Sequence, residues 1–281
     1  MSTLYLVATP IGNLEDITLR AVRVLREVTL IAAEDTRQTV KLLNHYQITT
    51  KVTSYHEHNK IKKLDMILHQ LEQGDVALVS DAGTPLLNDP GFELVQKAID
   101  YGYIISPIPG ASAPIAALSC SGISPDKFLY LGYLPRKKNE RLRALESVAT
   151  LPYTLIFLEA PHRLLQSLKD IQTVLGDRNI SIARELTKIH EEILRGKCTE
   201  LIKHFSVHDP RGEFTLVISG VPVREIWTLE QVNATTQKLL EQNKTVAEIA
   251  RELSSLSGWS RRKVYQLIIQ NNSDTPERGE R

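Results

Sequence analysis

The chain has 281 residues, of which 42% are hydrophobic and 24% are charged, and its formal net charge at pH 7 is +1. This composition is that of an ordinary globular protein, long enough for two domains and a small appendage. The near-neutral charge argues against a protein that binds polyanions over its whole surface, although it leaves room for a local basic patch.

The hydropathy and the cysteines indicate the cellular compartment in which the protein is expected. No stretch approaches the roughly 20 apolar residues that a bilayer span requires, so we expect no membrane association. Because the strand-like segment Leu4–Val7 begins almost at once, we expect no signal peptide. Cys120 and Cys198 lie far apart, form no metal-type pair and are typical of reduced thiols. We therefore expect a cytoplasmic protein.

The first 121 residues alternate short apolar runs with amphipathic helical patterns such as Leu19–Leu25 and Leu64–Leu71. The expected strands are Leu4–Ala8, Thr29–Ala33, Lys51–Tyr55, Val76–Ser80 and Ile104–Ile108. This alternation predicts an α/β domain with a mostly parallel, doubly wound sheet. Such sheets bind ligands at the carboxyl ends of their strands.

A second α/β domain is expected over residues 122–224, after the Gly/Pro/Ser-rich passage Ser121–Pro125. Its expected strands are Phe128–Leu131, Thr154–Leu158, Ile180–Ala183 and Phe214–Ser219, with a helix over His162–Leu175.

Residues 225–281 change character and predict a small helical domain. The expected helices are Thr228–Gln242, Val246–Leu256 and Arg261–Gln270. Thr245 and Glu248 form a capping-box pattern at the start of the middle helix. The polar segment Asn272–Arg281 is expected to be disordered.

Two loops at predicted strand ends have the chemistry of a ligand site. Thr9–Asn13 takes the place of a Rossmann glycine loop but lacks its glycine pattern, and Pro10 removes a backbone donor, which argues against NAD or FAD. Val79–Gly91 combines Asp, Gly, Thr and Pro. Its simple interpretation is a strand-to-helix connection with Asp89 as the helix N-cap; we favour a functional loop, with Asp89-Pro90-Gly91 only starting the helix.

Other strand ends add small or charged residues. The small residues of Pro107–Ala113 would let a flat ligand lie against the backbone at a helix start. Glu34 needs a partner if it is buried, and the simple alternative to a functional role is an ion pair with Arg37. In the second domain, Glu159–Arg163 and Arg184–Glu192 follow strands; such charge runs are often only solvated faces.

A metal site has little support. His56 and His58 would share one face if they lie on a strand, but no Cys or third His stands at a zinc-site spacing. We expect no metal. The sequence also lacks a P-loop and a Gly-x-Ser-x-Gly nucleophile elbow.

Six motifs stand in order along the chain: Thr9–Asp16, Ala33–Arg37, Ser80–Pro85, Pro109–Ala113, Glu159–Arg163 and Arg184–Glu191. Together they closely resemble the bacterial 16S ribosomal RNA (cytidine-2′-O)-methyltransferase I family of the tetrapyrrole methylase superfamily, over about residues 3–222 and into the helical tail. The resemblance implies two α/β domains with S-adenosyl-L-methionine in the cleft between them, and a homodimer. It also implies 2′-O-methylation of the ribose of a cytidine in the decoding region of 16S ribosomal RNA, within the small ribosomal subunit.

The resemblance also implies where the cofactor lies. The cofactor-binding residues that we expect are Pro10, Gly12, Asp81, Gly83, Thr84, Leu86, Ser112 and Ala113. The cofactor has no phosphate, so turns that expose backbone groups can match its polar edges, and Asp81 can accept hydrogen bonds from its hydroxyl or ammonium groups.

For catalysis, a ribose hydroxyl is a weak acid and needs a base or a charge that stabilises the alkoxide. We expect Arg184, Glu185 and Lys188 to be the catalytic residues beside the ribose. Lys188 could be the base only if burial or a neighbouring cation lowers its pKa; otherwise it would hold phosphate.

The expected substrate-binding residues are Glu34, Arg37, Arg163, Arg261, Arg262 and Lys263. The last three open the final predicted helix of a helix-turn-helix pattern and would contact RNA phosphates. The alternative for that region is a solubilising helix pair.

Two other functions stay open on the residues alone. One is a small-molecule methylase acting on a tetrapyrrole precursor, which would share the cofactor loops. The other is a non-catalytic nucleic-acid-binding protein, suggested only by the helical tail.

Overall fold

A computed structural model describes residues 2–222 and 227–273. Contacts group the chain into two compact units, Met1–Val221 and Pro222–Arg281. Disorder was expected from Asn272 on, but Asn272 and Ser273 lie in a helix, and the rest of that segment, from residue 274 on, falls outside the described residues.

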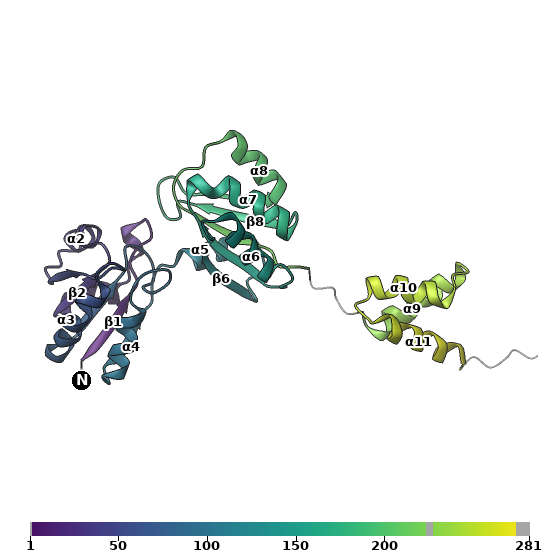
Figure 1. The fold of residues 1–281 in the computed structure, drawn as a ribbon, viewed down its shortest axis with the longest axis horizontal. Helices are drawn as coiled ribbons and strands as arrows, with labels where there is room; N and C mark the ends of the chain where they lie inside the picture. Colours follow the sequence, from purple (N-terminus) through teal and green to yellow (C-terminus); the bar gives the residue numbers. More distant parts are fainter. Residues whose placement is uncertain (1, 223–226, 274–281) are drawn as a thin grey trace, which may run out of the picture. The chain divides into compact units, whose positions relative to one another are not determined.

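The first sheet of unit one is entirely parallel, with strand order β3-β2-β4-β1-β5, which confirms the predicted doubly wound sheet (Figure 1). Its strands are β1 (Thr3–Val7), β2 (Leu30–Ala33), β3 (Val52–Ser54), β4 (Val76–Val79) and β5 (Ile104–Ile108). The helical segments between them are the 3₁₀ helix η1 (Leu14–Asp16), α1 (Leu19–Glu27), α2 (Thr36–His45), α3 (Lys60–Gln73) and α4 (Phe92–Asp100).

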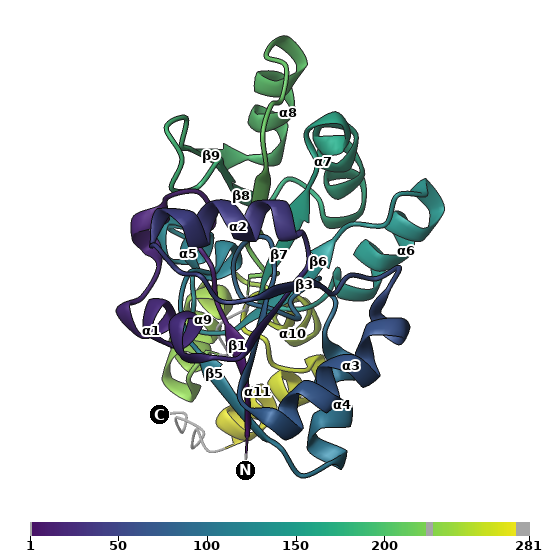
Figure 2. The same ribbon diagram turned by 90° about the vertical axis from the view of Figure 1, so that its left-hand side faces the viewer.

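Helices cover both faces of this sheet because alternate strand residues point to opposite sides. Ile31 and Ala33 of β2 pack with α1 and α2, whereas Leu30 and Ala32 pack with α3 and α4. Figure 2 shows these two pairs of helices on opposite sides of the sheet. Burial on both sides explains why β2 and β4 are continuous apolar runs.

The second sheet is mixed, with strand order β6-β7-β10-β8-β9; only β6 and β7 are parallel. The strands are β6 (Phe128–Tyr133), β7 (Thr154–Glu159), β8 (Asn179–Arg184), β9 (Glu192–Lys197) and β10 (Phe214–Ile218). The helices are α5 (Ala113–Ser121), α6 (Lys138–Val148), α7 (Pro161–Leu175) and α8 (Cys198–Val207). The edge strand β9 was not among the expected strands.

Helices α6, α7 and α8 pack on one face of this sheet and α5 on the other. Ala117 and Leu118 of α5 share a core cluster with Ile156 and Val217 of the second sheet. The helix before the expected boundary at residue 121 therefore packs on the sheet that follows it. The division into domains at residues 121 and 224 stays a prediction.

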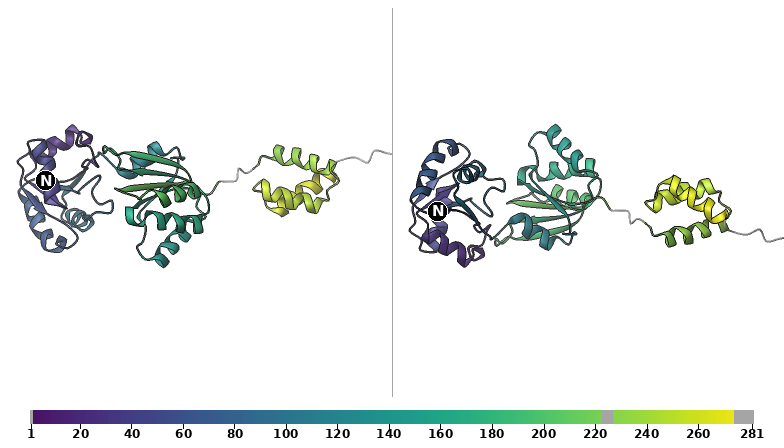
Figure 3. Two further views of the ribbon diagram at one scale, coloured as in Figure 1. Left: turned by 90° about the horizontal axis from the view of Figure 1, so that it is seen from above. Right: turned by 90° about the horizontal axis from the view of Figure 1, so that it is seen from below.

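Unit two contains the three expected helices, α9 (Leu229–Glu241), α10 (Val246–Leu256) and α11 (Arg261–Ser273) (Figure 3). They enclose a core of their own that includes Val232, Ile249 and Val264. The capping box of Thr245 and Glu248 is present as predicted.

In the part of the chain that the structure describes, no helix is long and apolar enough to cross a membrane.

Candidate active site

Loops at the carboxyl ends of the parallel strands are tied to one another by hydrogen bonds. Thr9 after β1 and Gly83 after β4 exchange two backbone hydrogen bonds, each 2.9 Å long. The Thr84 hydroxyl donates to the carbonyl oxygen of Ala111, in the loop after β5, at 3.3 Å. Three of the loops predicted from the sequence thus form one connected edge, at the end of the sheet where α/β proteins bind ligands.

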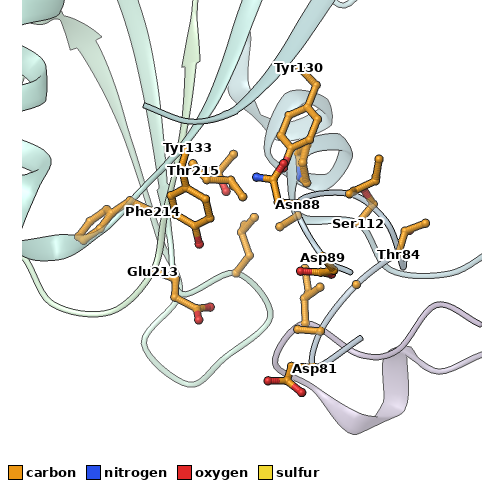
Figure 4. A pocket seen from close by; sticks show the side chains of 18 of the residues that line it. Asp81, Thr84, Asn88, Asp89, Ser112, Tyr130, Tyr133, Glu213, Phe214 and Thr215 are labelled. Atoms are coloured by element: carbon orange, nitrogen blue, oxygen red, sulfur yellow. The ribbon is translucent and has the colours of Figure 1, made fainter. Parts of the chain in front are cut away.

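A cavity of about 280 Å³ lies between this edge and the second sheet (Figure 4). One wall comes from the loops of the first sheet, and the other comes from β6, β10 and the ends of β7 and β8. Its lining residues are Ile11, Glu34, Asp81–Thr84, Leu87–Asp89, Ser112–Pro114, Tyr130, Tyr133, Leu158, Ala183, Leu186 and Glu213–Thr215. The volume is close to the lower end of the range for small-molecule sites, roughly 300–1,000 Å³.

Five of the eight expected cofactor-binding residues line this cavity: Asp81, Gly83, Thr84, Ser112 and Ala113. The other three, Pro10, Gly12 and Leu86, do not line it. Leu86 packs instead against the core beneath the first sheet, and its neighbours Leu87 and Asn88 face the cavity. The cofactor-binding roles of all eight residues stay predictions.

Gly12 connects the first loop to the second sheet. A Cβ atom placed on Gly12 would lie 2.5 Å from Lys188 Cγ and 2.8 Å from the carbonyl oxygen of Leu186. Beside it, the Asn13 amide donates to Thr187 Oγ1 at 3.0 Å. The glycine therefore serves the close approach of two loops that lie 174 residues apart.

Asp89 is not a helix N-cap, so the simpler interpretation of this loop is wrong, and of Asp89-Pro90-Gly91 only Gly91 caps the helix. The N-cap of α4 is Gly91, and Asp89 lines the cavity, with its carboxylate directed into it (Figure 4). Leu86 and Asn88 adopt the left-handed backbone region, with φ of 72° and 74°, which turns the loop toward the cavity. Burial, and then the charge of Asp81, raises the pKa of Asp89.

Glu34 and Asp81 stand next to Asp89. The Asp81 amide donates to Glu34 Oε2 at 3.4 Å, and Asp81 Oδ1 accepts from the Asp35 amide at 2.9 Å. Burial, and then the charge of Asp89, raises the pKa of Glu34. Arg37 does not pair with Glu34: it forms its ion pair with Asp35 at 2.6 Å, and its side chain is 86% exposed.

Two expected catalytic residues form a hydrogen-bonded group with a residue that the sequence reasoning missed. Lys188 Nζ donates to Glu185 Oε1 at 2.9 Å and to Glu213 Oε2 at 3.0 Å. Glu185 and Thr187 have φ of 48° and 64°, so the turn that holds Lys188 contains two strained residues. Of these residues, only Glu213 lines the cavity.

The pKa of Lys188 bears on its chemistry. Burial alone would lower this pKa, but the hydrogen bonds to Glu185 and Glu213 outweigh burial and raise it. The condition for Lys188 as general base, a lowered pKa, is not met. The ammonium can instead hold an anionic group, the other role that the sequence allowed.

Arg184, the third expected catalytic residue, does not line the cavity. Its guanidinium pairs with Glu192 at 3.2 Å and donates to the carbonyl oxygen of Arg211 at 2.7 Å. Its catalytic role stays a prediction.

The Arg163 side chain is paired with other residues in the protein interior. Its guanidinium forms an ion pair with Glu159 at 2.8 Å, and the side chain is only 15% exposed. Ser167 and the Ala160 amide also donate to the Glu159 carboxylate. These contacts give Arg163 a structural role, and its expected binding of substrate stays a prediction.

Tyr130 and Tyr133 form part of the far wall and were not predicted. They lie on either side of a register shift in β6, where Gly132 has φ of 66°. A Cβ on Gly132 would lie 2.7 Å from Asn88 Oδ1, so the glycine admits the Asn88 loop to the strand. Burial raises the pKa of Tyr130 to about 12 and also raises the pKa of Tyr133. Both tyrosine hydroxyls therefore stay protonated at neutral pH.

His56 and His58 lack the strand geometry that a metal site there requires. β3 ends at Ser54, so both histidines lie in the turn before α3, with ring centroids 6.1 Å apart. The described His, Cys, Asp and Glu side chains include no group of three or more that could hold a metal ion.

The basic residues of unit two gather at the start of α11. Arg261, Arg262 and Lys263 are exposed, and Lys263 Nζ lies 3.9 Å from the centroid of a Trp259 ring. Ser260 Oγ accepts from the Lys263 amide at 3.2 Å.

The two sheets and the cavity at the carboxyl ends of the parallel strands define an α/β protein with a small-molecule site. A model of the family described as Tetrapyrrole (Corrin/Porphyrin) Methylases matches residues 3–202, so the chain belongs to this family.

Curated relatives match most of the chain. The ribosomal RNA small subunit methyltransferase I of Halalkalibacterium halodurans is 51% identical over 230 residues, covering 80% of each chain. The protein of that name from Synechocystis sp. is 46% identical over 278 residues, covering 98% of this chain and 100% of the relative.

Solved structures confirm the fold. A diphthine synthase matches with a TM-score of 0.63 at 13% identity, covering 78% of this chain and 90% of that one. A cobalt precorrin-4 methyltransferase matches with a TM-score of 0.59 at 16% identity, covering 77% and 94%. At these identities the likeness shows the fold alone.

Family membership confirms that the chain is a methyltransferase whose cofactor is S-adenosyl-L-methionine. The cavity fits this group. The cofactor carries a sulfonium cation and no phosphate, and among the described lining residues acidic side chains occur without Lys, Arg or His. Ser112 and Ala113 lie at the start of α5, where small residues leave room for a flat ring.

Proposed function

We propose that the chain methylates ribosomal RNA of the small subunit, and more finely the ribose 2′-hydroxyl of a cytidine in the decoding region of 16S ribosomal RNA. The observation that carries the proposal is the Glu185–Lys188–Glu213 group beside the cofactor cavity. The curated relatives that cover most of the chain are named for ribosomal RNA methylation. The 2′-hydroxyl and the cytidine come from the motif resemblance.

S-adenosyl-L-methionine supplies, when bound, a methyl group already activated by the sulfonium. The protein must therefore mainly orient the acceptor in line with the methyl group and the sulfur, since alignment alone accounts for much of such catalysis. The cavity, lined by residues of both sheets, offers two opposed walls for this alignment.

Lys188 is a positive charge held at the rim of the cavity through Glu213. In this proposal its protonated ammonium binds an RNA phosphate or stabilises charge that develops on the acceptor oxygen. Lys188→Met should lower the single-turnover methylation rate while leaving cofactor affinity, measured by calorimetry, unchanged. Glu191→Gln, which removes a charge from the same loop, is the matched control. Near-wild-type rates for both Lys188→Met and Glu185→Gln would remove this group from the mechanism.

The acceptor is tested directly by transfer of tritiated methyl groups to purified small subunits that lack the modification. Label in 16S ribosomal RNA, mapped to a cytidine ribose, is the expected result, and naked 16S ribosomal RNA in parallel identifies the preferred form. Label on a porphyrin precursor and none on RNA would instead select the small-molecule methylase.

We also propose that the start of α11 binds RNA phosphates. Its three consecutive exposed cations point to an electrostatic contact, which weakens with salt in proportion to the phosphates neutralised. Replacing Arg261, Arg262 and Lys263 with alanine should weaken RNA binding and flatten its salt dependence, while Lys238→Ala on α9 should not. An unchanged salt slope in the triple variant would favour the solubilising role.

A homodimer and a cytoplasmic location complete the proposal. The edge strands β5 and β6 expose Ile104, Phe128 and Leu131, and apolar side chains on unpaired sheet edges are typical of interaction surfaces. Light scattering of the full chain should give twice the monomer mass; a monomeric mass at micromolar concentration would rule the dimer out.

A further inference from the structure

The cavity carries an unbalanced negative charge. Glu34, Asp81, Asp89 and Glu213 all line it, and none of the described lining residues is Lys, Arg or His. Glu213 is neutralised by Lys188 at 3.0 Å. The other three carboxylates form no ion pair with a cationic side chain in the described residues.

This arrangement leaves Glu34 and Asp89 near each other without an ion-paired cation among the described residues, whereas the exposed Asp81 interacts electrostatically with Arg37. Asp89 lies between Asp81 on its own side and Tyr133 and Glu213 on the side of the second sheet (Figure 4). Glu34 also lines the cavity and interacts electrostatically with Asp89.

Burial, and then the charge of Asp89, raises the pKa of Glu34. Burial also raises the pKa of Asp89, which the charge of Asp81 raises further, although a hydrogen bond from Ser80 acts in the opposite direction. Glu34 and Asp89 accept hydrogen bonds from neutral groups, but a buried charge kept only for the fold would be expected to have a cationic partner, so the unbalanced charge points to a cationic ligand.

The cofactor and its product differ in charge at one atom. S-adenosyl-L-methionine carries a sulfonium cation, whereas S-adenosylhomocysteine has a neutral thioether; adenine, ribose, α-ammonium and α-carboxylate are common to both. A contact with any common group affects the two ligands alike. Only a protein charge near the sulfur atom changes the affinity for the cofactor relative to the affinity for its product.

We propose that Asp89, supported by Glu34, determines specificity for the cationic cofactor over its neutral thioether product. Loss of the sulfonium charge during methyl transfer leaves the two carboxylates again without a cation, which favours product release. The inference rests on the cofactor of the family and not on the acceptor, so it stands whether the acceptor is RNA or a small molecule.

Calorimetry on the full chain tests the proposal with three ligands: S-adenosyl-L-methionine, S-adenosylhomocysteine and sinefungin, in which an amine-bearing carbon replaces the sulfonium. Asp89→Asn keeps the size of the side chain and removes its charge. We expect this substitution to weaken binding of the cofactor and of sinefungin roughly tenfold, and binding of S-adenosylhomocysteine by less than about twofold. A tenfold effect is the size expected for the interaction of two unit charges in a half-buried, partly screened site. Asp100→Asn, the same change at the far end of α4, should alter none of the three affinities.

Two results would overturn the proposal. An equal loss of affinity for the cofactor and the thioether would place Asp89 against a common group such as the α-ammonium. Unchanged affinities for all three ligands would show that its charge is not used. Glu34→Gln provides an independent second variant with the same expected change in the affinity ratio, and thermal denaturation of each variant verifies that it is folded.

Discussion

Arg163 offers a sharp choice between a structural role and substrate binding. In the structure its guanidinium neutralises Glu159, a carboxylate that is only 1% exposed. Replacing Arg163 with alanine would leave that charge buried without a cation. We therefore expect Arg163→Ala to destabilise the fold, whatever it does to RNA binding.

The magnitude follows from what remains around Glu159. Breaking a buried ion pair by removing one partner costs about 3–5 kcal/mol. Ser167 Oγ at 2.5 Å and the Ala160 amide at 2.8 Å still donate to the carboxylate, so the lower end, about 3 kcal/mol, is expected. For a unit of this size, that loss corresponds to a fall in melting temperature of roughly 6–12 °C.

Thermal denaturation of the full chain measures this fall, and a double variant provides the control. Arg163→Met with Glu159→Gln removes both charges and should recover much of the lost stability, because no unpaired charge is then buried. A melting temperature of Arg163→Ala within about a degree of wild type, together with weaker RNA binding, would refute the structural role.

Two further predictions concern the cavity and its rim. Gly12→Ala places a Cβ 2.5 Å from Lys188 Cγ, and overpacking of this kind costs about 1–3 kcal/mol. Thermal denaturation and single-turnover methylation should both record the loss; no change in either would show that the two loops separate freely. Because the folded-state pKa of Asp89 is raised, the contribution of this carboxyl to the stability of the ligand-free protein is fully present below the ordinary Asp value of 3.8 and is lost as pH rises through the raised pKa. Asp89→Asn should therefore melt higher than wild type at neutral pH, with the difference vanishing toward pH 3.8, and a lower melting temperature at neutral pH would contradict the argument.

Apolar periodicity was enough to predict most of the fold. Runs such as Val76–Val79 are buried on both faces of a parallel sheet, so their pattern is strong. The strand β9, with sequence Glu-Ile-Leu-Arg-Gly-Lys, escaped prediction because it is a half-exposed edge strand that carries charged side chains. Because of the same exposure, the pattern of Arg184–Glu192 indicated a single charged loop. In the structure, β8 ends at Arg184 and β9 begins at Glu192.

The sequence by itself determined the family, the cofactor and the loops that surround the cavity, because these depend on short motifs whose residues are neighbours in the chain. Only the tertiary structure decided which side chains meet. It turned Asp89 into the cavity through left-handed residues, joined Lys188 to Glu213, and assigned Arg163 to the interior. These outcomes depend on backbone dihedral angles and on contacts between distant segments, and one-dimensional patterns of residue type record neither.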